Sequence, residues 1–108
     1  MPHFVVVNEQ GPAWENSRPM RDQKEWNEHA AFMNALESER FIVLGGPLRN
    51  YSKHRTLLIC NAPNEQVVRT KLAEDPWMIA GMLRIIDLYS WEIVLGQLPV
   101  NPAQSPSV

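Results

Sequence analysis

The chain has 108 residues, of which 44% are hydrophobic and 20% are charged. This length suits one compact core, and this composition is too apolar for a disordered chain. Ten basic and twelve acidic residues leave a formal net charge of −2, without a basic block that could neutralise nucleic-acid phosphates. The apolar runs are far shorter than the roughly 20 residues of a membrane span, and the secretory-signal pattern is lacking. We therefore expect a cytoplasmic protein that binds neither nucleic acid nor a membrane.

The residue types that usually hold metals and nucleotides are sparse. A single cysteine, Cys60, excludes an internal disulfide framework and a cysteine metal cage. The three histidines, His3, His29 and His54, do not have the spacing of metal ligands. Gly45-Gly46-Pro47 lacks the lysine and the serine or threonine that complete a phosphate-binding loop. The sequence therefore predicts no bound metal and no cofactor.

The first half of the chain predicts a strand, a helix and a second strand. Residues 3–8 are an unbroken β-branched and aromatic run, which is typical of a strand covered on both faces. After a loop over residues 9–19, the helical spacing of the apolar residues predicts a helix from residue 20 to about residue 40. Residues 41–44 predict a second strand, which we expect to end at the Gly-Gly-Pro sequence of residues 45–47.

The second half adds two strands and a helix. A polar and basic loop leads to a strand over residues 56–61, and the connection favours antiparallel pairing with the preceding strand. A helix is predicted from residue 62 to residue 73. A further helical turn begins at Asp75-Pro76-Trp77, since aspartate at the cap and proline at the first helical position are start signals. The last strand is predicted over residues 82–95.

The resulting β-α-β-β-α-β order is that of a ferredoxin-like α+β fold, with a four-stranded antiparallel sheet and both helices on one face. We assign this fold to residues 1–96, and we interpret the proline-rich residues 97–108 as a mobile tail or a dimer arm. The first and last strands are too apolar for the other face of the sheet to meet water. A second copy, packed sheet against sheet in a symmetric homodimer, would cover this face.

Two residues could carry chemistry, although each also has a structural explanation. His29 lies on the apolar stripe of the predicted first helix, three residues after Trp26 and four before Met33. A core histidine that bonds to a backbone carbonyl would fit there, but histidine is also the side chain that titrates near neutral pH. Asp75 is explained fully by helix capping. Taken singly, neither residue defines a site.

Several short motifs, in their order and separation, resemble those of the YCII-related family of small dimeric α/β-barrel proteins. The resemblance extends from the first strand to Leu95 and leaves out only the tail. It rests on Glu28-His-Ala-Ala-Phe-Met33, Val43-Leu-Gly-Gly-Pro-Leu48, Asp75-Pro-Trp77, Gly81 and Trp91.

The resemblance implies that His29 and Asp75 lie side by side as an acid–base dyad. In such a pair the carboxylate orients the imidazole and stabilises its charged form. Many relatives carry an arginine three residues before the histidine, where this chain has Trp26. Arg18 or Arg21 could supply that positive charge from the preceding loop, although a helix-surface ion pair would explain Arg21 equally well.

Other candidate substrate-binding residues come from the glycines and the tryptophans. Gly45, Gly46 and Pro47 could let the backbone turn beside His29, close to where a small ligand would lie. Most of the four tryptophans suit a core or a dimer contact, but one or two could wall an apolar pocket for a flat ligand. We therefore group Gly46, Pro47 and Trp77 with the two arginines as candidate substrate-binding residues.

A His–Asp pair suits proton abstraction next to a carbonyl, followed by elimination or tautomerisation. One positioned base contributes about 10²–10⁴-fold, so the small-molecule substrate must already be acidic, as hydroxylated aromatic and quinoid compounds are. The resemblance implies the same chemistry, because YCII-like proteins are linked to removal of chloride from chlorinated hydroxyquinols. We predict a cofactor-independent lyase or isomerase, with dehydrochlorination of a chlorinated hydroxyquinol as its most concrete form.

Two other functions stay open. One is a non-catalytic dimer that binds a metabolite or a partner protein and uses His29 and Asp75 structurally. The other is a cofactor-free monooxygenase, in which an activated aromatic substrate itself reacts with oxygen. Oxygen uptake would distinguish the monooxygenase from a lyase, which releases halide without oxygen.

Overall fold

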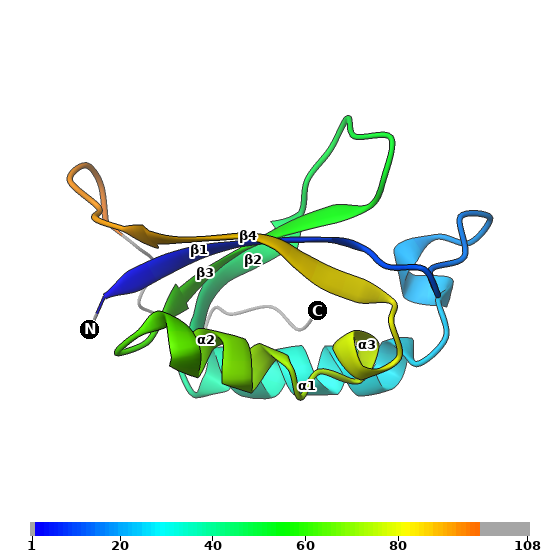
Figure 1. Cartoon of the computed structure of the whole chain (residues 1–108), viewed down its shortest axis with the longest axis horizontal. Coiled ribbons are helices and arrows are strands. Elements are labelled where there is room, and N and C mark those ends of the chain that lie inside the picture. Colours follow the sequence, from blue (N-terminus) through cyan, green and yellow to red (C-terminus); the bar gives the residue numbers. More distant parts are fainter. Residues whose placement is uncertain (1, 98–108) are drawn as a thin grey trace.

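The structure, a computed structural model, describes residues 2–97. Within these residues, four strands form one antiparallel sheet in the order β2-β3-β1-β4, and the helices cover one of its faces (Figure 1). This arrangement confirms the predicted ferredoxin-like α+β fold. The strands are β1 (His3–Gln10), β2 (Ile42–Pro47), β3 (Arg55–Asn61) and β4 (Leu83–Trp91). The helices are α1 (Trp26–Ser38), α2 (Glu65–Leu72) and α3 (Pro76–Ile79), with a 3-10 turn, η1, at Met20–Asp22.

Two segments differ from their predicted boundaries. The long first helix is interrupted, because Glu25 has left-handed backbone angles (φ 63°) and α1 begins only after it. A left-handed residue cannot lie inside a right-handed helix. Strand β2 does not end at Gly45 but continues to Pro47, which pairs with Thr56 of β3. Proline is tolerated there because β2 is an edge strand.

The two later elements are shorter than predicted. Helix α2 begins at Glu65, because the side chain of Asn64 caps it by accepting a hydrogen bond from the backbone N–H of Val67. Strand β4 ends at Trp91, whose partner is His3 at the beginning of β1. The residue before β1 is Pro2, which has no backbone N–H to donate to a further pair. Residues 98–108 of the predicted tail lie outside the described residues. None of the described helices has the length and apolar character needed to cross a membrane.

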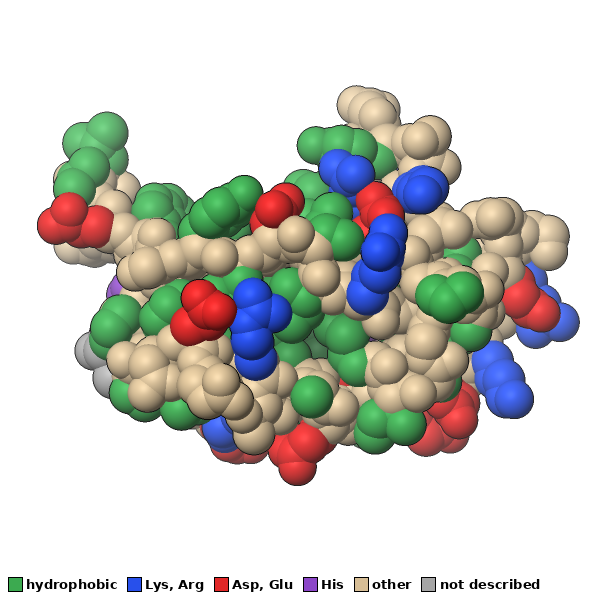
Figure 2. All heavy atoms as spheres, in the orientation of Figure 1, with side chains coloured by type: hydrophobic (Ala, Val, Ile, Leu, Met, Phe, Trp, Pro, Cys, Tyr) green, Lys and Arg blue, Asp and Glu red, His purple; other side chains and the backbone are tan. Residues whose placement is uncertain are grey.

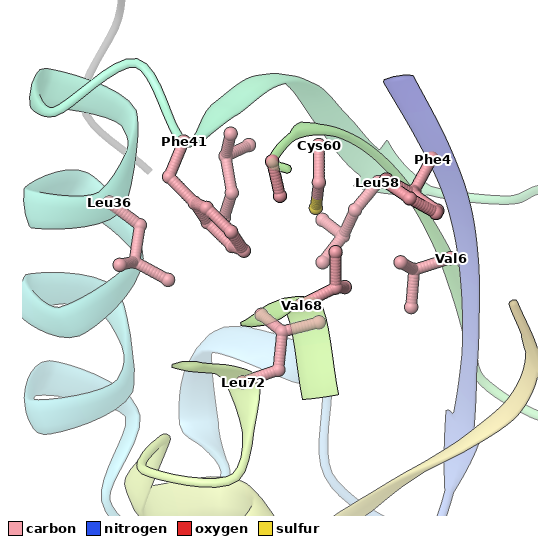
Figure 3. Packing of buried hydrophobic residues seen from close by; sticks show 10 residues of the cluster. Phe4, Val6, Leu36, Phe41, Leu58, Cys60, Val68 and Leu72 are labelled. Atoms are coloured by element: carbon pink, nitrogen blue, oxygen red, sulfur yellow. The ribbon is translucent and has the colours of Figure 1, made fainter. Parts of the chain in front are cut away.

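The main hydrophobic core lies between the sheet and the helices α1 and α2 (Figure 3). Phe4 and Val6 of β1 point into it and meet Leu36 from α1 and Val68 and Leu72 from α2. Each fully buried aliphatic or aromatic side chain contributes about 1.5–3 kcal/mol relative to an exposed one. This cluster therefore holds the helix layer against the sheet at the end away from α3.

A second buried cluster lies where β1 and β4 meet α3, and it contains Trp77, Met82 and Leu83. A close backbone contact closes this end of the fold. The N–H of Gly11 donates to the carbonyl of Met82 at 2.8 Å. A Cβ atom at Gly11 would overlap the carbonyl oxygen of Gly81, which itself has left-handed angles (φ 76°). The fold therefore requires glycine at residue 11, a requirement that the loop composition alone did not show.

The opposite face of the sheet is apolar and carries no helix among the described residues (Figure 1). Val5 of β1 lies between Ile59 of β3 and Tyr89 of β4, and Val7 lies beside Leu57. Tyr89 is 57% exposed. Hydrophobic side chains stand along this upper side of the molecule in Figure 2. We call this surface the open face.

One end of the open face carries a charged cluster around Glu9. The Glu9 carboxylate accepts hydrogen bonds from Arg55 and Arg84, each at 3.0 Å, and Lys53 lies 3.9 Å from it. The hydrogen bonds from the two arginines hold the pKa of the Glu9 carboxyl below its usual range. The open face thus has a charged cluster at one end and an apolar middle, in which Asp87 accepts a hydrogen bond from the hydroxyl of Tyr89.

Replacing Gly11 by alanine should destabilise the fold by about 1–3 kcal/mol, because the new methyl group has no space beside the Gly81 backbone. Urea denaturation followed by circular dichroism measures this loss. The matched control is Gly46→Ala, since a Cβ at Gly46 meets nothing within 4 Å. Equal midpoints for the wild type and Gly11→Ala would show that the close contact imposes no constraint.

Candidate functional site

His29 and Asp75, which the resemblance implies are neighbours, lie in direct contact. Nδ1 of His29 is 2.8 Å from Oδ1 of Asp75 and 2.9 Å from Oδ2. Both residues are buried, with 6% and 2% of their surfaces exposed. Because a carboxylate accepts hydrogen bonds, Nδ1 is the nitrogen that carries the proton in this pair. Nε2 of His29 is then the ring atom that can exchange a proton with a ligand.

Asp75 serves this contact and caps a helix with the same carboxylate. Its Oδ1 atom accepts a hydrogen bond from the backbone N–H of Trp77 at 3.0 Å, and Pro76 occupies the first position of α3. In the sequence analysis, helix capping was an alternative explanation for Asp75. The structure shows that Asp75 can cap α3 and contact His29 at the same time. His29 lies in the first turn of α1, where its N–H donates to the carbonyl of Glu25 at 3.0 Å.

Trp77 fixes the orientation of the histidine ring. Its ring stacks on the imidazole of His29 with a centroid separation of 3.9 Å and an angle of 7° between the planes. The indole is fully buried, and its Nε1 donates to the carbonyl of Lys24 at 2.8 Å. The stacking sets the plane of the imidazole, and the bond to Asp75 sets its rotation within that plane. The stack and the hydrogen bond together therefore fix the direction in which Nε2 points.

Two more tryptophans surround this pair. The ring of Trp26 lies 5.8 Å from that of His29 and 5.6 Å from that of Trp77. Trp14 meets Trp77 edge to face at 5.4 Å, and its other side stacks on His54 at 4.3 Å. The site is therefore a chain of aromatic rings with a histidine at each end.

The two candidate arginines lie outside this contact. Arg18 forms an exposed ion pair with Glu15 at 2.9 Å. The guanidinium carbon of Arg21 lies 5.6 Å from the ring centroid of Trp26, and no ion pair within residues 2–97 joins it to Glu25. Arg21 thus contacts the residue that stands where many YCII-related proteins have arginine. Binding of a substrate by either arginine stays a prediction.

Gly46 and Pro47 lie in the exposed part of the edge strand β2. The backbone there is extended and paired, so it does not turn as the sequence analysis expected. Within the described residues, no hydrogen bond or ring contact joins either residue to His29 or Asp75. Their role in substrate binding also stays a prediction.

His54 is the residue near the site that the sequence analysis did not single out. It precedes β3 and shares strand alternation with Leu58 and Cys60, so its side chain lies on the helix-facing side of the sheet. Burial first, and then the charge of His29, lower the pKa of His54 below its usual range. The alternation of inward residues along β3, extended back to residue 54, could have placed this histidine beside the core. The predicted strand begins only at residue 56, so the histidine was assigned to a loop.

Cys60 is not a candidate nucleophile. It is a free thiol that is fully buried in the main core, and burial raises its pKa to about 12. Because the thiolate is the reactive form, such a thiol is inert near neutral pH. The described residues contain no group of three or more histidine, cysteine or acidic side chains that could hold a metal ion.

A cavity of about 250 Å³ lies beside the aromatic rings rather than at the dyad itself. Lys24, whose carbonyl accepts the hydrogen bond from Trp77, contributes to its wall. Neither His29 nor Asp75 is part of the lining. The candidate site is therefore formed by the buried contacts of His29 and Asp75 and not by this cavity. Its walls come from Ala13, Glu15, Lys24, Glu25, Ala80 and Met82.

Comparison with known proteins supports the fold assignment. No family model matches the chain, and no curated protein matches it. Among solved structures, the chain is similar to 5-chloro-2-hydroxyhydroquinone dehydrochlorinase (TftG) from Burkholderia phenoliruptrix AC1100, in complex with 2,5-dihydroxybenzoquinone. The two share 20% sequence identity, the match covers 86% of this chain and 95% of the other, and the TM-score is 0.51. This likeness shows a shared fold.

Replacing Asp75 by alanine should cost about 2–4 kcal/mol of stability, because it removes a helix cap and leaves the buried Nδ1–H of His29 without its acceptor. The matched control is Asn64→Ala, which removes only the exposed cap of α2 and should cost about 1 kcal/mol. Urea denaturation of both variants isolates the contribution of the histidine contact. Equal losses would show that this contact adds nothing to stability.

Proposed function

We propose that the protein is a cofactor-independent acid–base enzyme of the lyase or isomerase type. The observation that carries this proposal is the buried contact between His29 and Asp75, at 2.8 Å, which leaves Nε2 for the substrate. The proposed substrate is a small hydroxylated aromatic or quinoid compound, and the proposed family is the YCII-related one. The shared fold with a dehydrochlorinase supports both.

The most concrete form of this proposal is loss of hydrogen chloride from a chlorinated hydroxyquinol. Two hydroxyl protons leave the ring oxygens during the reaction. One of them is transferred to the carbon that bears chlorine, and the second departs as the C–Cl bond breaks. The chloride takes the bonding electron pair and a quinone forms, so the reaction needs no external oxidant. Nε2 of His29 is suited to accept the hydroxyl proton and to return it to carbon.

Two neighbours of His29 would contact its ring once Nε2 has accepted a proton from the substrate. The Asp75 carboxylate would form a charge-assisted hydrogen bond with the imidazolium. The face of Trp77, stacked at 3.9 Å, would also attract the cation. Asp75 therefore acts as a positioning residue that supports the proton transfer without contacting the substrate.

The aromatic rings suit a flat ligand. Trp14, Trp26 and Trp77 lie together beside the dyad, and indole faces commonly wall pockets for aromatic compounds. Of the two arginines, Arg21 is the better candidate for a substrate oxygen, because the charge of Arg18 is compensated by Glu15. We keep Gly46 and Pro47 as lesser candidates.

Chloride release from 5-chloro-2-hydroxyhydroquinone under nitrogen tests this function. The wild type should release chloride, and His29→Gln should lower the rate by about 10²-fold or more while circular dichroism shows an intact fold. His3→Gln is the matched control, because His3 lies at the beginning of β1 and has no described contact with the dyad. Turnover that needs oxygen would favour the monooxygenase. Ligand binding without turnover, unchanged in His29→Gln, would favour the binding protein.

We also propose that the open face forms a symmetric homodimer. Its centre is apolar around Val5, Ile59 and Tyr89, with one acidic residue, Asp87, beside Tyr89, and a charged cluster lies at one end. An apolar surface of this kind usually marks an interface. A second copy would cover it by packing sheet against sheet.

Sedimentation velocity at micromolar concentration should therefore give a dimer for the wild type and a monomer for Val5→Glu. The dimer would bury the new carboxylate at the centre of the interface and remove its hydration, which opposes association. Ile79→Glu is the matched control, since Ile79 is 75% exposed on α3 in the helix layer. A wild-type monomer, or a dimer that persists in Val5→Glu, would rule out this interface.

A further inference from the structure

Two polar atoms near the site are buried without a hydrogen-bond partner. They are Oδ1 of Asn8 and Nε2 of His54, and neither has a partner within residues 2–97. Asn8 is only 3% exposed, and it directly follows the apolar residues 4–7 of β1. Buried polar groups in proteins are almost always paired, so an unpaired one requires an explanation.

Both atoms belong to the helix-facing side of the sheet. Asn8 alternates with Phe4 and Val6, which point into the core, and its direct partner on β3 is Thr56. His54 lies two residues before Thr56 and is therefore the diagonal neighbour of Asn8 on the same face. Diagonal neighbours are close enough to contact one small ligand together.

The ring of His54 is held in place. The backbone N–H of His54 donates to the side chain of Gln10 at 2.8 Å, and the backbone carbonyl of His54 accepts from the Gln10 N–H at the same distance. The imidazole stacks on Trp14, with 8° between the planes. Trp14 in turn contacts Trp77, and the ring of Trp77 stacks on the imidazole of His29. Segments that are distant in the sequence thus bring His54 into the same aromatic cluster as the dyad.

We propose that Asn8 and His54 form a second polar wall of the substrate site, where they bind ring oxygens of the substrate. This inference rests on the proposed function. The amide oxygen of Asn8 accepts a hydrogen bond from a substrate hydroxyl group, and Nε2 of His54 bonds to a neighbouring ring oxygen. His29 then acts on a different oxygen of the same ring. The site therefore selects polyhydroxylated rings over rings with few oxygens.

The test measures equilibrium binding of 2,5-dihydroxybenzoquinone and of hydroquinone, which has two ring oxygens fewer, by isothermal titration calorimetry. The wild type should prefer the first compound. Asn8→Leu, which is nearly isosteric, and His54→Phe, which keeps the stack on Trp14, should each weaken binding of the first compound about tenfold. Both variants should bind hydroquinone as the wild type does, so the preference should shrink.

A stability measurement separates this role from a structural one. Asn8→Leu removes a buried amide oxygen that has no partner within residues 2–97, so its urea midpoint should equal or exceed that of the wild type while affinity falls. Asn61→Leu is the matched control, because Asn61 also has an unpaired buried oxygen but lies on the open face, opposite His3. It should leave the binding of both compounds unchanged.

The outcomes separate the two proposals. Wild-type affinity and preference in Asn8→Leu and His54→Phe, together with chloride release that depends on His29, would overturn the second polar wall and leave the proposed function standing. A lower urea midpoint with unchanged affinity in Asn8→Leu would assign Asn8 a structural role and also overturn the inference. A wild type that neither binds 2,5-dihydroxybenzoquinone nor releases chloride would overturn both.

Discussion

The candidate site depends on one buried carboxylate. Asp75 accepts a hydrogen bond from the backbone of Trp77, which starts α3, and it contacts Nδ1 of His29 on α1. These contacts join two helices that are far apart in the sequence. Because Trp77 packs its ring on the same histidine, the position of α3 and the orientation of the imidazole are set together. Any displacement of α3 would therefore also move the imidazole of His29.

The two ends of the sheet differ: the apolar core that stabilises the fold lies at one end, and the candidate site lies at the other. At one end, Phe4 and Val6 of β1 meet the aliphatic residues of α1 and α2. Further along the same strand the inward positions become Asn8 and Gln10, which face the aromatic cluster and His54. Polar groups buried at this second end weaken the fold locally unless a ligand satisfies them. The large apolar cluster at the first end offsets that cost.

The patterns of the sequence were sufficient for the β-α-β-β-α-β order of the elements, the antiparallel pair of β2 and β3 and the turn that begins at Asp75, because each depends on local periodicity, loop length or capping. The beginning of α1 was not predictable, since the helix is interrupted by the extended backbone of Gln23 and the left-handed angles of Glu25. The contact between His29 and Asp75 spans 46 positions and came from resemblance, because no local rule relates residues that distant. His54 was missed because it lies directly before β3, in a segment that the sequence predicts to be a loop.

The stack of Trp77 on His29 also has an optical consequence. Indole fluorescence is quenched by a charged imidazolium in van der Waals contact more strongly than by a neutral imidazole. With the two rings 3.9 Å apart and almost parallel, emission from Trp77 should follow the protonation of His29. Trp14 and Trp26 lie within 6 Å of Trp77 and can exchange excitation energy with it, so the whole cluster shares this signal. The protein thus carries its own reporter of the proton that its proposed chemistry moves.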